Sequence, residues 1–120
     1  MRPCIFCKIA TGELPSHKVY EDEHFVAFLD IRPLSTGHTL VIPKTHHRWV
    51  WDVVDIGTYF EVARKIARAQ QKAFGTELIR AKVYGEEIEH AHIWVFPDTT
   101  STQADKMDFA RNAEKIKMHL

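Results

Sequence analysis

The feature that most constrains this fold is one long amphipathic segment set among short apolar runs. Between Ile56 and Phe74, apolar side chains recur every three or four residues, which predicts a helix with one apolar face. Asp55 is suited to cap its start, and Gly75 to end it. A helix of this kind packs its apolar face against another layer, and the surrounding runs predict that this layer is a sheet.

The runs around this helix predict strands and two shorter helices. Runs rich in β-branched and aromatic residues predict strands at 19–20, 25–29, 38–42, 78–84 and 90–96. Helices are expected at 4–11 and roughly 102–118, the latter with Phe109, Ala110, Ala113 and Ile116 on one face. Segment 30–37 reads as a loop, and 44–54 is ambiguous. Strands in sequence-adjacent hairpins run antiparallel, so we expect an α+β fold: a five-stranded antiparallel sheet with the long helix on one face.

Composition narrows the class of protein. A chain of 120 residues suits one domain. Lys and Arg (16) balance Asp and Glu (16), whereas proteins that bind nucleic acid broadly carry a basic excess. There is no apolar run near the ~20 residues that span a membrane, and no secretory signal at the start. We therefore expect a cytoplasmic protein with neither nucleic acid nor membrane as partner.

The two cysteines, Cys4 and Cys7, have the spacing C-x-x-C. A structural disulfide is disfavoured in the cytosol, so metal or redox chemistry is the better interpretation. In a thioredoxin-like redox site the cysteine pair follows a strand, and no strand is predicted before Cys4 and Cys7. A structural zinc site needs four nitrogen or sulfur ligands. His46 and His90 follow or begin predicted strands, so a site formed by Cys4, Cys7, His46 and His90 is sterically reasonable.

Segment 90–96 alternates in an unusual way. Side chains alternate along a strand, so one face carries His90, His92, Trp94 and Phe96, and the other carries Ala91, Ile93 and Val95. The small apolar set fits a helix-covered core, which leaves the histidines on the partly exposed face. Histidine acts as base and as metal ligand, although two histidines can simply pack on a sheet surface. His38 begins another strand next to a loop, a position suited to binding or catalysis.

These motifs resemble the histidine-triad (HIT) family of nucleotide hydrolases and transferases. The resemblance lies in CIFCKIATGELPSHKVYEDEHFVAFLDIRPLSTGHTLVIPKTHH and GEEIEHAHIWVFP and covers roughly residues 3–98. It implies a HIT-like fold for a domain at 1–100, with 101–120 as a C-terminal helical extension packed on that domain. It also implies a homodimer joined through the long helix and the sheet edge.

The resemblance implies a catalytic role for His92. The family pattern is three histidines separated by apolar residues, and the middle one matches His92. It would attack the α-phosphorus of a purine nucleotide of the nucleoside phosphoramidate or dinucleotide type and form a nucleotidyl-histidine intermediate. The expected bound partner is a purine nucleotide such as AMP or a nucleoside phosphoramidate. A neutral imidazole is a good nucleophile and a good leaving group at phosphorus. His38 matches a further histidine that supports the phosphate site.

Binding residues carry over in the same way. Asp30 matches the carboxylate that holds the ribose hydroxyls, and Gly85 and Glu87 match positions that approach the phosphates. Residues that match the apolar slot for the purine are Ile5, Phe6, Ile9, Phe28, Ile31 and Leu40. Without the resemblance these apolar residues would read as plain core. Relatives with the N-terminal C-x-x-C bind zinc through residues that match Cys4, Cys7, His46 and His90, with His47 as the alternative to His46. His90 would then be a metal ligand and not a catalytic group.

The chain departs from the family pattern at two places. Trp94 stands at the third histidine position in the nucleotide site, and Glu86 replaces a glutamine. Indole has an N–H donor but no acid–base function. We therefore expect binding to be retained, with the rate reduced or the substrates restricted to those with good leaving groups. The alternatives are a nucleotide-binding or sensing module without turnover, and a zinc-stabilised interaction protein.

Overall fold

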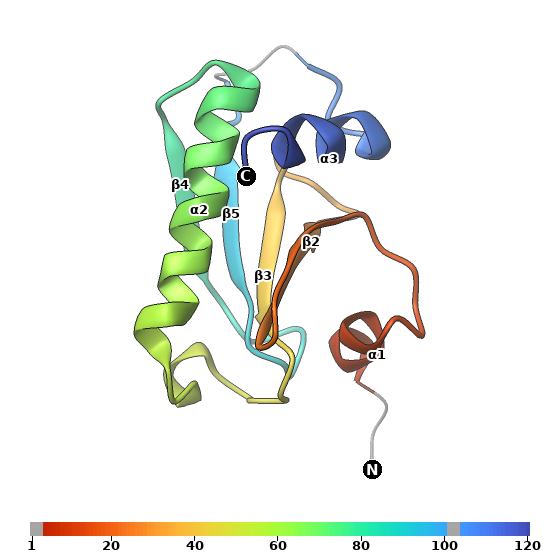
Figure 1. Cartoon of the computed structure of the whole chain (residues 1–120), viewed down its shortest axis with the longest axis vertical. Helices are drawn as coiled ribbons and strands as arrows, with labels where there is room; N and C mark the ends of the chain where they lie inside the picture. The colour runs from red at the N-terminus through yellow and green to blue at the C-terminus, as the bar shows by residue number, and fades with distance from the viewer. Residues whose placement is uncertain (1–3, 101–103) are drawn as a thin grey trace.

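A five-stranded antiparallel sheet lies at the centre of the protein in the computed structural model, which describes residues 4–100 and 104–120 (Figure 1). Across the sheet the strands are β1 (Lys18–Glu21), β2 (Phe25–Leu29), β3 (Thr39–Pro43), β5 (Ile93–Pro97) and β4 (Ile79–Val83). Each neighbouring pair runs antiparallel. The architecture predicted from the sequence is therefore confirmed.

The helices begin and end close to the predicted residues, except at the C-terminal end. They are α1 (Ile5–Thr11), a 3-10 turn η1 (Val50–Asp52), α2 (Ile56–Phe74) and α3 (Phe109–Lys117). The Asp55 carboxylate caps α2 by accepting the N–H of Thr58, and Gly75 ends it with a left-handed φ of 63°. The segment 44–54, which the sequence left ambiguous, contains η1.

β2 and β3 are buried on both faces, and each face of the sheet belongs to a different core cluster. Alternation along β2 sends Phe25, Ala27 and Leu29 to one face, where the larger cluster includes buried residues of α2 and α3. Val26 and Phe28 point to the other face, where the smaller cluster includes residues of α1. Figure 1 shows α2 crossing in front of β4 and β5, with α3 beside its upper end. The functional residues lie on the α1 face.

Two buried polar side chains fix α2 against the sheet. The Tyr59 hydroxyl donates to the Val41 carbonyl at 2.7 Å. The Gln70 amide donates to the carbonyls of Gly37 and Val95, both at 2.9 Å. Because a buried amide needs partners, these bonds set where α2 sits relative to the start of β3 and the middle of β5.

The predicted strand 90–96 begins later than expected, because β5 starts at Ile93. His90 and His92 lie in the preceding segment, where the N–H of Ala91 donates to the His47 carbonyl at 2.7 Å. The connection between β4 and β5 therefore spans residues 84–92. The predicted partial exposure of the two histidines was also wrong, since they are 0% and 5% exposed.

The C-terminal helix is shorter than predicted. Residues 102 and 103 of the predicted span lie outside the described residues, and 104–108 form bends and turns before α3. The Asp108 carboxylate caps α3 by accepting the N–H of Arg111. Ala110, expected on the apolar face, is exposed, whereas Asn112 is buried and donates its amide to the Asp105 carbonyl at 2.9 Å.

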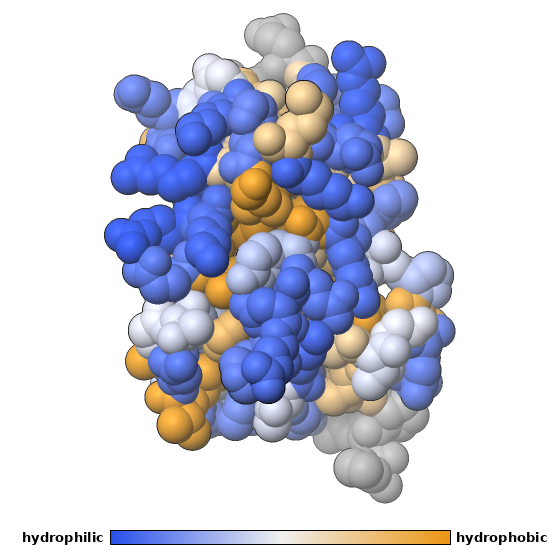
Figure 2. Space-filling view, viewed as in Figure 1, coloured by the Kyte–Doolittle hydropathy of each residue, from blue (hydrophilic) through white to orange (hydrophobic). Residues whose placement is uncertain are grey.

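Polar and charged side chains cover most of the face that carries α2 (Figure 2). Between them lie smaller hydrophobic patches, which is ordinary for a protein surface. Within residues 4–100 and 104–120, no helix combines the length and the apolar character needed to cross a membrane.

We expect Gly37→Ala to lower the free energy of unfolding by about 2 kcal/mol or more. Gly37 has a φ of 75°, and a Cβ there would overlap the Phe74 ring of α2. Gly57→Ala is the matched control, because that position has ordinary backbone and open space around it. Urea unfolding of both variants checks this, and equal stabilities would contradict it.

Candidate functional site

Four side chains from three separate segments converge on one point near α1. The Sγ atom of Cys4 lies 3.3 Å from Nδ1 of His90, and Sγ of Cys7 lies 3.4 Å from Nδ1 of His46 and 3.5 Å from Nδ1 of His90. All four ligand atoms lie within 4.8 Å of one another. Cys4 and Cys7 meet because Cys4 is the N-cap of α1 and Cys7 lies one turn into it.

The geometry of this cluster fits a tetrahedral metal ion. Zinc bonds of ~2.3 Å to sulfur and ~2.0 Å to nitrogen place neighbouring ligand atoms roughly 3.3–3.8 Å apart. Nε2 of His90 lies 2.8 Å from the Pro43 carbonyl and must donate to it, which leaves Nδ1 with its lone pair toward the thiols. Burial lowers the pKa of His90 to about 4, so the ring is neutral, as a ligand must be.

Without a bound cation, the thiols in the cluster do not readily form thiolates. Burial, followed by the neighbouring Cys4 thiol, raises the pKa of Cys7 to about 11. A bound cation would reverse this by stabilising the thiolate. His46 belongs to the cluster, whereas His47 contributes its main-chain carbonyl to the Ala91 N–H. The geometry thus favours His46 over His47 as the fourth ligand.

His92 is held in one tautomer by the backbone. Its Nδ1 lies 2.8 Å from the main-chain carbonyl of His90, and because a carbonyl only accepts, Nδ1 carries the proton. In the neutral ring Nε2 then has the lone pair, and it forms no hydrogen bond with any described residue. The Phe6 ring of α1 packs edge-on against His92, with ring centroids 5.3 Å apart. This is the arrangement that a nucleophilic imidazole requires.

His38 lies buried behind this position and is also neutral. Its Nδ1 accepts the N–H of Leu34 at 3.0 Å, so Nε2 carries the proton. Burial lowers the pKa of His38 to about 4, and the Asp30 carboxylate, 3.7 Å from Nε2, offsets only part of that effect. Asp30 uses Oδ1 to accept the N–H of Arg32 at 2.9 Å. Oδ2 is thus the oxygen better placed to accept a ligand hydroxyl.

Trp94 lies next to His38 with its N–H unsatisfied. The ring centroids of Trp94 and His38 are 5.2 Å apart, and Tyr84 packs edge-on against the indole at 5.0 Å. Both Nε1 of Trp94 and Nε2 of His38 are buried and have no hydrogen-bond partner among the described residues. Buried donors are nearly always paired, so two unpaired donors on adjacent rings make this part of the sheet face complementary to a group that brings acceptor atoms.

The residues that match the purine slot fall into two groups. Phe6, Ile9, Phe28 and Leu40 are buried together in the smaller core cluster. Ile5 and Ile31 lie on the surface, 49% and 72% exposed. Plain core therefore accounts for the buried four, while the two exposed isoleucines are available to a ligand.

The segment after β4 approaches His92 with mixed charge. Backbone N–H groups of Glu86 and Gly85, followed by the nearby Arg48 guanidinium, hold the pKa of the Glu86 carboxyl below its usual value. Arg48 also donates to the Gly85 carbonyl at 2.6 Å and stacks on Trp49 at 3.8 Å. Gly85 is buried and Glu87 is exposed.

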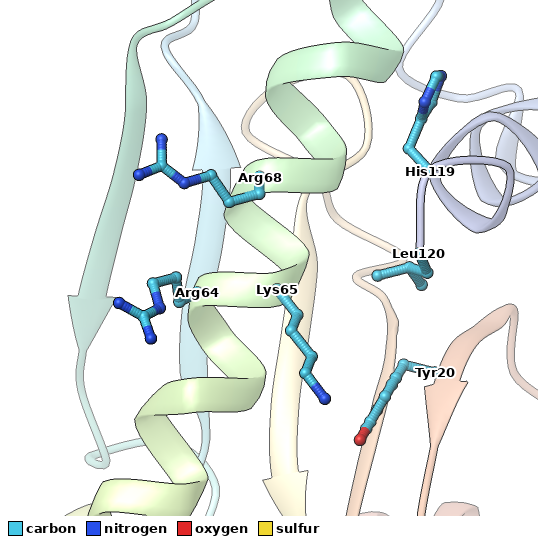
Figure 3. Close-up of a pocket in the computed structure, with 6 residues that line it drawn as sticks. All are labelled: Tyr20, Arg64, Lys65, Arg68, His119 and Leu120. Carbon is cyan, nitrogen blue, oxygen red and sulfur yellow. The ribbon is translucent and has the colours of Figure 1, made fainter.

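A separate hollow of about 540 Å³ lies between α2 and the end of the chain (Figure 3). Its lining residues are Tyr20, Arg64, Lys65, Arg68, His119 and Leu120. Lys65 and Tyr20 point toward one another there, while Arg64 and Arg68 point away (Figure 3). The hollow contains none of the residues singled out from the sequence, so it is not part of the site around His92.

Several contributors to the site were missed from the sequence. The carbonyls of Pro43 and His90 orient the two histidines, and main-chain roles leave no compositional signal. The sequence also did not indicate that Arg48 would donate a hydrogen bond to the Gly85 carbonyl. Tyr84 and the neighbouring Lys82 alternate along one strand face beside Gly85, and that pattern was the available signal.

Comparison with known proteins gives relatives along most of the chain. The family model described as the HIT domain matches residues 11–101. The protein hit of Bacillus subtilis is 46% identical over 78% of this chain and 70% of its own. The adenosine 5'-monophosphoramidase of Saccharomyces cerevisiae is 35% identical over 78% of this chain and 61% of its own. The adenylylsulfatase of Arabidopsis thaliana is 36% identical over 78% and 51%.

Solved structures extend the similarity to the whole fold. A Hit-like protein from Bartonella henselae superposes with a TM-score of 0.87 at 34% identity, covering 98% of this chain and 96% of its own. A zinc-bound histidine triad family protein from Mycobacterium smegmatis gives 0.83 at 30% identity, covering 97% and 91%. Together with the sheet, the helices and the matched residues 11–101, these similarities show that the chain belongs to the HIT family.

Proposed function

We propose that this protein is a nucleotide hydrolase or nucleotidyl transferase that acts through a nucleotidyl-histidine intermediate on His92. The observation that carries the proposal is the 2.8 Å hydrogen bond from Nδ1 of His92 to the His90 carbonyl. It fixes the tautomer in which Nε2 is the nucleophile, so no proton has to be removed before attack. Relatives named as an adenosine 5'-monophosphoramidase and an adenylylsulfatase support a purine nucleotide as substrate.

The reaction takes two displacements at phosphorus. Nε2 of His92 attacks the α-phosphorus, a bond forms between them, and the leaving group departs with the electron pair of its bond. The imidazolium formed keeps its Nδ1–H on the His90 carbonyl, which accepts the added positive charge. Water or another acceptor then attacks phosphorus, the bond to Nε2 breaks, and His92 returns to its starting tautomer.

The rest of the nucleotide is assigned to nearby groups. Oδ2 of Asp30 is proposed to accept the ribose hydroxyls, since Oδ1 is already engaged by Arg32. The purine would lie against the exposed Ile5 and Ile31. Nε2–H of His38 is proposed to donate to a phosphoryl oxygen, because it is buried without a partner.

Zinc is proposed as the metal of the cluster formed by Cys4, Cys7, His46 and His90. The ligand distances, the two thiols and the zinc-bound relative support this choice. Bound zinc would supply a structural cross-link and no acid–base chemistry, because four protein ligands leave no open position. A reducing cytoplasm, where thiols stay free, suits this role.

A second candidate function is nucleotide binding or sensing without turnover. Trp94 favours it, because the indole replaces a group able to carry a proton. Calorimetry with AMP, run beside an assay for AMP release, separates the two candidates. Binding without release would favour the sensing module.

A homodimer is proposed through α2 and the free edge of β4. β4 is the outer strand of the sheet, and its middle residues, Arg80, Ala81 and Lys82, are exposed. An outer strand presents unpaired backbone groups that a second copy can complete. The identical edge of a partner would extend the sheet across both chains.

We expect His92→Ala to remove AMP release from adenosine phosphoramidate, a loss of at least 10²-fold given that the nucleophile is gone. Chromatography of AMP measures this, and mass spectrometry of quenched wild-type protein should find one nucleotidyl group on the His92 peptide. His24→Ala, at an exposed turn, is the control and should keep full activity. Equal rates for His92→Ala and wild type would refute the mechanism.

We expect about one zinc per chain in protein purified without added metal. His46→Ala should lose the zinc and lower the melting temperature, whereas the neighbouring His47→Ala should keep both, since only His46 contributes its ring to the cluster. Elemental analysis and thermal unfolding give the two readouts. If zinc is retained in His46→Ala and lost in His47→Ala, then His47 and not His46 is the fourth ligand.

Sedimentation should give a particle of about twice the chain mass of 13.9 kDa. The expected dimer follows from pairing at the free β4 edge. A single species at the monomer mass, up to concentrations of about 100 μM, would contradict the proposed dimer, since closed interfaces of standard size hold at far lower concentrations.

A further inference from the structure

We propose that the preferred substrates are nucleotidyl mixed anhydrides whose leaving group departs as an oxyanion (sulfate, phosphate or carboxylate), and that Trp94 and Lys82 set this preference. The inference rests on the proposed function and adds to it the chemical class of the leaving group. Phosphoramidates, whose amine must take up a proton as it departs, are expected to be poorer substrates.

The first argument is the lack of a proton donor for the leaving group. His90 has one ring nitrogen in the metal-binding cluster and the other on the Pro43 carbonyl, so it has no proton to give. The Nδ1 proton of His92 is held by the His90 carbonyl. Neither histidine therefore directs an N–H toward a leaving group.

The described side chains that contact or pair with Trp94 do not supply this proton either. His38 is a buried neutral imidazole whose Nε2–H can donate a hydrogen bond but would become an anion if it gave up the proton. Glu86 is an exposed carboxylate, and Trp94 has only its indole N–H. Tyr84 meets the indole edge-on through its ring, and the positive charge of Lys82 is assigned to the leaving-group anion.

The second argument is the set of donors that remain unpaired on the same sheet face. Nε1–H of Trp94 and Nε2–H of His38 are buried without partners in the described part of the chain, on rings 5.2 Å apart. A buried donor without a hydrogen bond is unfavourable, so the site is complementary to a ligand that brings acceptor oxygens. Because Nε2–H of His38 is assigned to a phosphoryl oxygen that both substrate types carry, Nε1–H of Trp94 is the donor left for the leaving group. An oxyanion offers it several acceptor oxygens, whereas a departing amine offers none once it is protonated.

Lys82 adds a positive charge to this donor set. It pairs across the sheet with Trp94, and its Nζ lies 5.7 Å from the Tyr84 ring centroid and 5.9 Å from that of Phe96. Its neighbour on the same face, Arg80, is neutralised by Asp98 at 2.8 Å. Lys82 itself forms no ion pair within residues 4–100 and 104–120, so its charge is available to an anionic group.

The step balances without a proton donor. Nε2 of His92 forms a bond to the α-phosphorus while the bond from phosphorus to the bridging oxygen breaks, and that oxygen keeps the electron pair as part of sulfate, phosphate or carboxylate. Water then attacks the nucleotidyl-histidine and releases AMP, with its proton passing to solvent. With a phosphoramidate, the same first displacement stalls until the nitrogen acquires a proton.

The test compares adenylyl sulfate with adenosine 5'-phosphoramidate, each corrected for its uncatalysed reaction. Wild-type protein should show a kcat/KM at least tenfold higher for the sulfate. Trp94→His restores a group able to carry a proton. It should raise kcat/KM for the phosphoramidate by about tenfold or more, and so lower the ratio of kcat/KM for the sulfate to kcat/KM for the phosphoramidate. Trp94→Phe keeps an aromatic ring but loses the N–H, and should lower kcat/KM for the sulfate by about fivefold.

Lys82→Met should lower the ratio of sulfate to phosphoramidate turnover by several-fold, and its matched control Lys72→Met, on the outer surface of α2, should leave the ratio unchanged. Circular dichroism and thermal unfolding establish that each variant is folded. A wild-type ratio near one, or a Trp94→His variant that raises both rates equally, would overturn this inference and leave the hydrolase intact. No AMP from either substrate would overturn the proposed hydrolase, and this inference with it.

Discussion

The side chain and backbone of His90 hold the two halves of the site together. One ring nitrogen faces the thiols of Cys4 and Cys7, the other donates to the Pro43 carbonyl, and the main-chain carbonyl accepts Nδ1–H of His92. Any shift of His90 would therefore move a proposed metal ligand and, at the same time, the carbonyl that fixes the tautomer of His92, the proposed nucleophile. The residue is fully buried, so no water replaces these bonds if one is lost. The position of His90 therefore constrains both the structure of the site and its proposed chemistry.

The two faces of the sheet are covered very differently, and this explains why the site lies where it does. The face under α2 and α3 carries the larger core. The other face is covered by α1, a helix of seven residues that is too short to be stable alone. Its own contacts are Phe6 and Ile9 in the smaller cluster. A metal ion held by Cys4 and Cys7 would supply the anchoring that so short a helix lacks, and would keep Phe6 against His92.

Trp94 illustrates how one substitution within a family pattern changes the chemistry that the surrounding residues allow. The indole fills the space between His38 and Tyr84 with aromatic contacts, so the fold accommodates it. The change removes acid–base chemistry at this position, because an indole N–H donor replaces an imidazole that can both give and take a proton. Within the described part of the chain, the buried donors on Trp94 and His38 have no hydrogen-bond partner. The proposed preference for an oxyanion leaving group and the proposed lack of general acid catalysis both follow from this one side chain.

Local periodicity determined the elements of this protein, and packing decided the site. Alternation along 25–29 and the helical spacing of 56–74 are properties of neighbouring residues, so the sheet, α2 and its caps were predictable from the sequence. The sequence also named four candidate metal ligands, which the fold places within 4.8 Å. It did not predict that His90 and His92 are buried ahead of β5, nor that carbonyls orient them. Those features depend on contacts between segments up to 86 residues apart, and only the folded chain brings such segments together.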